Sequence, residues 1–236
     1  MIYIESKINE ILEYNFNSGR ILALYNIPFA YYLKFTLKRV AEIRKLDPLP
    51  ILDEINSLTK QDSVKVFDLD VKQLVDKIIN EFHDYSRKRL SLAEKNYSLV
   101  YQEFKNVFPK IENLYNEFLE FIDEYESHLL KEEQAIFPEI LKMKSIFDNS
   151  IQQVPMSLEI PLENMEREHI EQERFLEKIY QDSIALFNKN QNHHNFITFK
   201  NEMDLFFINH SYHVYFENEI LFKKTRRLEN TFFFKT

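Results

Sequence analysis

The sequence predicts an all-α protein in which a small helical N-terminal domain precedes an up-down-up-down four-helix bundle. Glycine occurs once in 236 residues, as Gly19, and this scarcity argues against turn-rich β architecture and phosphate-binding loops. Apolar residues make up 44% of the chain, with 22 Phe and 13 Tyr, which can fill an aromatic-rich core. The motif H-x-x-x-E-x-x-x-I/L-F occurs at residues 128–137 and again at 213–222, which indicates two equivalent helices.

The N-terminal domain is predicted to cover residues 1–62. It contains four segments with helical apolar patterns, at residues 7–15, 19–26, 30–45 and 51–60. The third is predicted to be one longer helix that ends at the DPLP sequence. A linker then leads to the bundle, with Asp68 or Asp70 as the N-cap of its first helix.

The bundle is predicted to cover residues 68–228. Its four helices are expected at residues 70–104, 110–143, 158–188 and 194–226. The sequences NVFPK, FDNSIQQVP and NKNQNHHN separate these helices and contain the proline and polar residues that turns need. In every helix a His or Glu interrupts an otherwise apolar stripe.

Two His–Glu pairs occupy these interrupting positions. His128 precedes Glu132 by four residues and His213 precedes Glu217 by four, so each pair lies on one helix face, one turn apart. An imidazole and a carboxylate placed in this way can be two ligands of one metal site. The alternative is a pair of exposed contacts along each helix, without metal.

Single histidines complete a two-fold repeat. His83 precedes His128 by 45 residues, and His169 precedes His213 by 44. The predicted turns lie near the midpoints between successive His and Glu positions. If the helices are antiparallel, all four helices therefore present these residues at one level of the bundle. Buried carboxylates and imidazoles are unfavourable unless paired or bound to metal, so the set predicts a site for iron or manganese, and zinc also fits. A hydrogen-bonded histidine without metal is the alternative for His83 and His169.

The ordered motifs resemble those of the hemerythrin-like (HHE) di-iron proteins, and more specifically of the repair-of-iron-centres family, which protects or restores iron–sulfur proteins after nitrosative and oxidative stress. The resemblance covers residues 70–225 and rests on EFHDYSR, SHLLKEEQAIFPEI, MEREH and HVYFENEILF. It implies two non-haem irons (Fe) with oxo and carboxylate bridges. Glu132 and Glu217 are the expected bridging carboxylates, and the expected terminal ligands are His83, His128, His169 and His213.

The N-terminal domain departs from the family pattern. The family's N-terminal turn usually carries adjacent cysteines followed by glycines, whereas Ala30, Tyr31, Tyr32 and Leu33 stand there in this chain. Thiol chemistry is therefore absent, and this domain is expected to be a packing or docking module.

The first long helix departs from the pattern as well. The family usually has another His about 21 residues after the first, but Val100, Tyr101 and Phe104 occupy that region here, so one iron is expected to lack a nitrogen ligand. His210, on the face of His213, is one candidate replacement, and the phenolate of Tyr101 is another. A buried neutral His210 without metal is the alternative.

Four other polar residues lie close to the motifs. Glu166 and Glu168 resemble the family's acidic residues beside the third helix's ligand, and they either line a route for metal or protons or form a solvated face. His193 and His194 lie in a polar turn and are expected at the surface.

The resemblance implies a response to nitrosative or oxidative stress, through iron donation to damaged iron–sulfur proteins or through handling of NO. One alternative is a hemerythrin-like protein that binds or senses O2 or NO without repair. Another is a helical interaction module that has lost its metal. Iron–sulfur proteins and diatomic gases are the expected partners, and a homodimer is left open.

Bulk properties narrow the classes of partner and compartment. The net charge of −8 argues against nucleic acid as the main partner. The absence of Cys excludes disulfides, thiolate ligands and thiol nucleophiles. No apolar run reaches about 18 residues, so no membrane span is expected. The N-terminus lacks a signal-peptide pattern, so a cytoplasmic location is expected.

Overall fold

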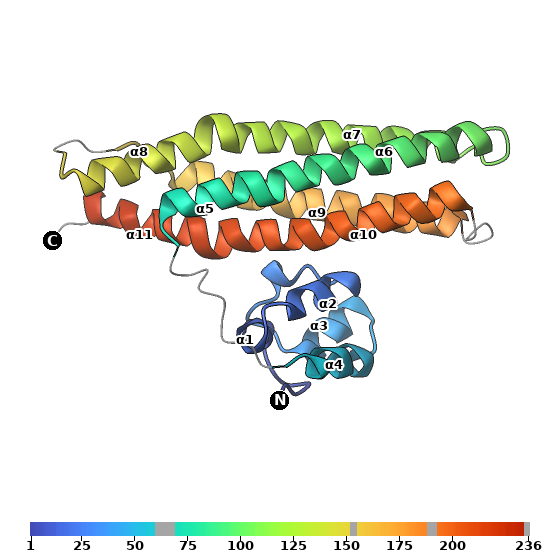
Figure 1. Ribbon diagram of the computed structural model, residues 1–236, viewed down its shortest axis with the longest axis horizontal. Coiled ribbons are helices and arrows are strands. Elements are labelled where there is room, and N and C mark those ends of the chain that lie inside the picture. Colours follow the sequence, from blue (N-terminus) through green and yellow to red (C-terminus); the bar gives the residue numbers. More distant parts are fainter. Residues whose placement is uncertain (60–68, 152–154, 188–192, 234–236) are drawn as a thin grey trace.

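The computed structural model describes residues 1–59, 69–151, 155–187 and 193–233, and in these ranges it is helical and contains no strand. Figure 1 shows long helical rods lying side by side in a bundle, with the short N-terminal helices gathered on one side of it. The predicted all-α bundle is confirmed. None of the described helices is long and apolar enough to cross a membrane.

The rods of the bundle are built from consecutive helical segments, of which η3, η4 and η5 are π-helical. The first rod consists of α5 (Val71–Lys77), η3 (Ile78–His83) and α6 (Asp84–Phe104). The second consists of α7 (Ile111–Lys131), η4 (Glu132–Ile136) and α8 (Phe137–Asp148). The third is α9 (Glu159–Phe187), and the fourth consists of α10 (His194–Tyr215), η5 (Phe216–Leu221) and α11 (Phe222–Phe233). These bounds follow the predicted ranges, although the second and fourth rods extend further at their C-terminal ends.

A capping box begins the first rod. The Asp70 side chain accepts a hydrogen bond from the Gln73 backbone N–H at 2.8 Å, and the Gln73 side chain accepts one from the Asp70 N–H at 3.0 Å. Of the two predicted N-caps, Asp70 is therefore confirmed. The other, Asp68, lies outside the described residues, as does most of the predicted turn NKNQNHHN.

Two apolar clusters fill the interior. The first is rich in aromatic rings and lies toward the end of the bundle where α6 meets α7, with Tyr97, Phe118 and Phe199 in mutual ring contact. The second joins the opposite end of the bundle to the N-terminal helices and includes Phe137 and Phe222. Along the second rod the first cluster ends at residue 129 and the second begins at residue 137, so a buried polar level lies between them.

The N-terminal unit, residues 1–59, packs against α10. Its elements are α1 (Ile8–Tyr14), α2 (Ser18–Leu24), η1 (Phe29–Tyr31), α3 (Leu37–Arg44) and α4 (Pro48–Ser57). The ring of Tyr212 from α10 contacts Phe16 and Phe29, with centroid separations of 5.0 and 5.1 Å. The predicted domain boundary falls within residues 60–68, outside the described residues, so the division at residue 62 stays a prediction.

The prediction of one helix over residues 30–45 is wrong. The chain forms the short 3-10 turn η1, and α3 begins only at Leu37, with Thr36 as its N-cap. The intervening segment bonds to the start of the chain, where the Ile8 N–H donates to the Phe35 carbonyl at 3.0 Å. Long-range backbone pairing therefore overrides the local helical pattern.

The DPLP sequence begins a helix. The Asp47 side chain accepts a hydrogen bond from the Leu49 N–H at 3.0 Å and caps α4. Pro48 occupies the first turn of α4, where its missing N–H needs no partner. The preceding helix α3 ends at Arg44, and Lys45 follows in the left-handed conformation that terminates many helices.

Gly19→Ala should destabilise the protein by about 1–3 kcal/mol because the added methyl group overpacks a fixed contact. A Cβ at Gly19 would lie 2.8 Å from the Tyr212 hydroxyl oxygen and 3.0 Å from Phe29. Tyr212 cannot yield easily, since its hydroxyl donates to the Phe16 carbonyl at 2.8 Å. In an unconstrained helix the same substitution would stabilise by about 1 kcal/mol. Denaturant unfolding measures the difference.

The matched control is the same substitution in a Tyr212→Ala background. With the Tyr212 ring removed, Gly19→Ala should be less destabilising, because only the contact with Phe29 remains. Equal destabilisation in both backgrounds would show that contact with Tyr212 is not its cause.

Candidate metal centre

Three of the predicted ligands lie at or next to the ends of π-helical segments, one on each of three rods. His83 is the last residue of η3, Glu132 is the first residue of η4, and Glu217 is the second residue of η5. A π turn contains one residue more than an α turn and therefore changes the direction of the side chains around it. The third rod supplies His169 from α9.

Six buried side chains form two overlapping groups of donors that could hold metal ions. The His83 group comprises His83, Glu132, His213 and Glu217, and the His128 group comprises His128, Glu132, His169 and Glu217. In each group the donor atoms lie within 4.8 Å of one another. None of the six residues is more than 1% exposed. Both carboxylates belong to both groups.

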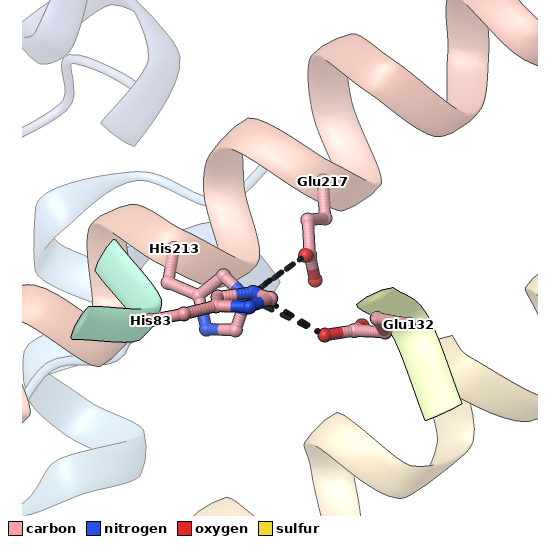
Figure 2. Close-up of side chains that lie close together, drawn as sticks. All are labelled: His83, Glu132, His213 and Glu217. Atoms are coloured by element: carbon pink, nitrogen blue, oxygen red, sulfur yellow. Dashed lines mark hydrogen bonds and ion pairs between the residues drawn. The ribbon is translucent and has the colours of Figure 1, made fainter. Parts of the chain in front are cut away.

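In the His83 group, the imidazoles come from the first and fourth rods and meet the two carboxylates (Figure 2). His83 Nε2 lies 3.4 Å from Glu132 Oε2, and His213 Nε2 lies 2.8 Å from Glu217 Oε1. The two Nε2 atoms are 3.1 Å apart. Two ligand atoms that each lie about 2.1 Å from one ion are about 3.0 Å apart when the ligand–metal–ligand angle is 90°, and about 3.4 Å apart when it is tetrahedral. The observed separations are close to these values, so one ion can bind all four atoms.

The His128 group uses the other oxygen of each carboxylate. His128 Nε2 lies 3.2 Å from Glu132 Oε1, and His169 Nε2 lies 3.0 Å from Glu217 Oε2. His169 Nε2 is also 3.6 Å from Glu132 Oε1. Glu132 and Glu217 therefore each direct one oxygen to each group, which is the arrangement of carboxylates that bridge two metal ions.

The two copies of the motif also position the histidines of the neighbouring rods. Glu133 follows Glu132, and its carboxylate accepts a hydrogen bond from His83 Nδ1 at 2.8 Å. Asn218 follows Glu217, and its side-chain oxygen lies 3.1 Å from His169 Nδ1. In both cases the residue after the bridging carboxylate orients a ring so that its Nε2 faces the centre.

The last residue of each motif copy has a matching role. The Phe137 ring stacks on His83 with a centroid separation of 5.8 Å, and the Phe222 ring stacks on His169 at 6.4 Å. The phenylalanine that ends the motif is thus an apolar wall of the site. From the sequence alone these phenylalanines are predicted only to be core residues.

The remaining two imidazoles have partners from other elements. His128 Nδ1 donates to Glu168 Oε2 at 3.0 Å, and Lys131 binds the same carboxylate at 2.9 Å. His213 Nδ1 lies 3.3 Å from the buried Tyr125 hydroxyl. The sequence singled out Glu168 but not its bond to His128, and it offered no signal for Tyr125 beyond its place on an apolar stripe.

The carboxylates of Glu132 and Glu217 lack hydrogen-bond partners on all four of their oxygens. Burial raises the pKa of the Glu217 carboxyl, but His213 and His169 outweigh this effect and hold the pKa well below its usual value. Buried, ionised oxygens without partners need a cation. The donors and their separations therefore fit metal ions, although the identity of the metal does not follow from them.

Protons on the imidazoles balance part of this charge when no metal is bound. Burial lowers the pKa of His128, but the Glu132 carboxylate near its Nε2 and Glu168 at its Nδ1 raise the pKa to about 10. Burial likewise opposes protonation of His169, yet Glu132 and Glu217 raise its pKa. A metal ion must displace these protons.

Each group contains two imidazoles, and the expectation that one iron lacks a further nitrogen ligand stays a prediction. The position 21 residues after His83 is Phe104, about 30 Å away along the rod, where it contacts Phe108 and Phe187. Tyr101 lies 18 residues after His83, about 27 Å along the rod, and stacks on Tyr115. No side chain at that end of α6 can reach the centre.

His210 is buried but is not brought into either group of donors. Its Nδ1 lies 3.4 Å from the Tyr125 hydroxyl, and its Nε2 faces Glu173 at 3.6 Å. Of the other polar residues, Glu166 pairs with Arg226 at 2.7 Å and His193 lies 2.8 Å from Glu103. His194, the first residue of α10, is exposed as expected.

Glu132→Ala should remove both metal ions, whereas His169→Ala should remove one, because Glu132 belongs to both donor groups and His169 to one. Elemental analysis after dialysis is expected to give about two fewer ions per chain for Glu132→Ala than for the native protein, and about one fewer for His169→Ala. Glu139→Ala, which removes a half-buried carboxylate from the same rod, is the control and should retain both ions. Equal losses in the two site variants would contradict shared carboxylates.

Metal affinity should rise with pH from about 6 to about 8, because the ion competes with the proton held on His128. Calorimetric titration in two buffers of different ionisation enthalpy measures the protons released. Glu168→Gln removes a group that raises the pKa of His128, so it should reduce the release. Unchanged release in Glu168→Gln would show that this pair does not hold the displaced proton.

A scan against protein-family models finds none that matches the chain, and a search of curated proteins finds no match to its sequence. The geometry of the two donor groups is compatible with a hemerythrin-like site.

Proposed function

We propose that this chain is a hemerythrin-like protein with two non-haem irons, of the repair-of-iron-centres type. The observation that carries the proposal is that two pairs of imidazoles share both oxygens of Glu132 and Glu217 inside a four-helix bundle. Imidazole and carboxylate donors suit iron, although manganese and zinc accept the same ligands.

The protein residues would hold the irons, fix their ligands and exclude water. Each ion would have four protein donors, so a metal that prefers six ligands would retain two positions for small molecules. Bound iron would supply reversible one-electron chemistry and affinity for diatomic gases. Glu133, Glu168, Asn218 and Tyr125 hold the imidazoles in place, and stacked phenylalanines keep the surroundings apolar.

In this proposal the protein responds to nitrosative and oxidative stress, either by donating iron to damaged iron–sulfur proteins or by handling NO. The iron–sulfur partner, the cytoplasmic location and a homodimer remain predictions. Complete burial of the six ligands supports NO handling more than donation, because a diatomic gas needs a smaller opening than an iron ion on its way to another protein.

A second candidate is binding or sensing of O2 or NO without repair. This candidate is favoured by the Nδ1 partners that hold all four imidazoles in place, because ligands fixed in this way suit a metal ion that is retained rather than donated. The two candidates differ in what happens to the iron.

The iron-loaded protein should show the charge-transfer absorption of a dinuclear ferric centre and about two irons per chain, and Glu132→Ala should lose both signals. Under anaerobic reductant, NO handling predicts NO consumption over many turnovers, measured with an electrode. Iron donation predicts recovery of an iron-depleted [4Fe–4S] enzyme, with matching loss of iron from this protein.

A reversible spectral change with O2 or NO, without turnover or transfer, would establish the binding or sensing candidate. One iron or none per native chain would remove the dinuclear assignment itself. Glu139→Ala again serves as the control that retains iron.

A further inference from the structure

A pocket of about 300 Å³ lies between the N-terminal unit and α9. One wall comes from the loop and turn that carry Tyr31, and the other comes from successive turns of α9 that carry Glu173 and Glu177. Arg44 also lines the pocket, but it is engaged with Glu177 through two hydrogen bonds of 2.6 and 3.0 Å. The pocket is separate from the two donor groups of the metal centre.

Two residues that line this pocket, Tyr31 and Glu173, carry a buried polar atom without a hydrogen-bond partner, and His210, which faces Glu173 from α10, carries a third. Glu173 is 6% exposed and its Oε2 has no partner. His210 is 1% exposed and its Nε2, which faces Glu173, has none either. The hydroxyl of Tyr31, on the N-terminal side of the same pocket, is the third such atom. Three buried polar groups without partners would together cost several kcal/mol unless a ligand binds them.

The separation of Glu173 from His210 fits a shared ion better than a direct bond. Glu173 Oε2 and His210 Nε2 are 3.6 Å apart, which is too long for a hydrogen bond between them. Two ligands bound to one ion at about 2.1 Å with tetrahedral geometry are about 3.4 Å apart, close to the observed distance.

The Glu173 carboxyl can lose its proton near neutral pH. Burial raises its pKa to about 7, since Arg44 opposes the shift only in part. The ionised carboxylate is the form that binds a metal ion beside an imidazole.

We propose that Glu173 and His210 form a third cation site, closed on the N-terminal side by Tyr31, which binds a divalent transition-metal ion. Imidazole and carboxylate ligands suit Zn²⁺, Fe²⁺ or Mn²⁺, and the pocket leaves room for water to complete the coordination. An ion there would connect the N-terminal unit to the bundle, because Tyr31 belongs to η1 while Glu173 and His210 belong to α9 and α10. The site does not depend on iron in the dinuclear centre.

The test is a titration of metal-free full-length protein with Zn²⁺, followed by calorimetry and by equilibrium dialysis with elemental analysis. The native protein should bind three ions per chain and Glu173→Gln should bind two. Glu177→Gln, which removes a carboxylate one turn away in the same pocket, is the matched control and should bind three. Tyr31→Phe should keep the third ion but weaken its binding by about tenfold.

Two results would overturn the proposal. Native protein that saturates at two ions would mean that a water molecule or a proton satisfies these groups. A third ion that persists in Glu173→Gln would place it elsewhere on the molecule. Circular dichroism checks the fold of each variant, and His210→Gln gives the same readout if Glu173→Gln does not fold.

The dinuclear proposal can fail without affecting this test. Native protein that binds one ion, with none in Glu173→Gln, would establish the third site and remove the dinuclear centre. The two proposals are therefore distinguished by the number of ions alone.

Discussion

The burial of two carboxylates at one level of the bundle is the constraint on which the rest of the structure depends. Glu132 and Glu217 are fully buried, and no hydrogen bond reaches their oxygens. Two such charges would oppose folding by several kcal/mol each without compensation. Four imidazoles surround them, and the cation positions that these donors define complete the balance. The polar level therefore separates two apolar clusters that would otherwise form one core.

An internal two-fold repeat in the sequence provides the groups that compensate these buried charges. Each motif copy supplies one imidazole and one carboxylate shared by both donor groups. It also orients and covers a histidine on the neighbouring rod, through the residue after the carboxylate and through the final phenylalanine. The two motif copies differ in the partners of their histidine Nδ1 atoms. His128 Nδ1 bonds to Glu168, whereas His213 Nδ1 lies beside the Tyr125 hydroxyl. This difference makes the surroundings of the two donor groups electrostatically unequal, since one partner is charged and the other is neutral.

The N-terminal unit contributes more than a cover for the bundle. It shares an apolar cluster with the end of the bundle nearest η5, and its Tyr31 lines the same pocket as Glu173 of α9. The Tyr125 hydroxyl lies 3.3 Å from His213 and 3.4 Å from His210, so it stands between these two imidazoles.

Much of the fold and of the candidate site could be read from the chain alone, because both rest on spacing along helices. A separation of four residues places His128 and Glu132 on one face, and matched separations across turns bring four helices to one level, whatever the details of packing. A residue 21 positions from His83 on the same rod lies about 30 Å away, so no side chain there can supply a further nitrogen ligand. Only the tertiary structure decided that Thr36 starts a helix, that Glu133 and Asn218 orient histidines on other rods, and that His210 turns toward Glu173. These contacts join residues far apart in the chain, and local periodicity carries no information about which side chains meet across an interface.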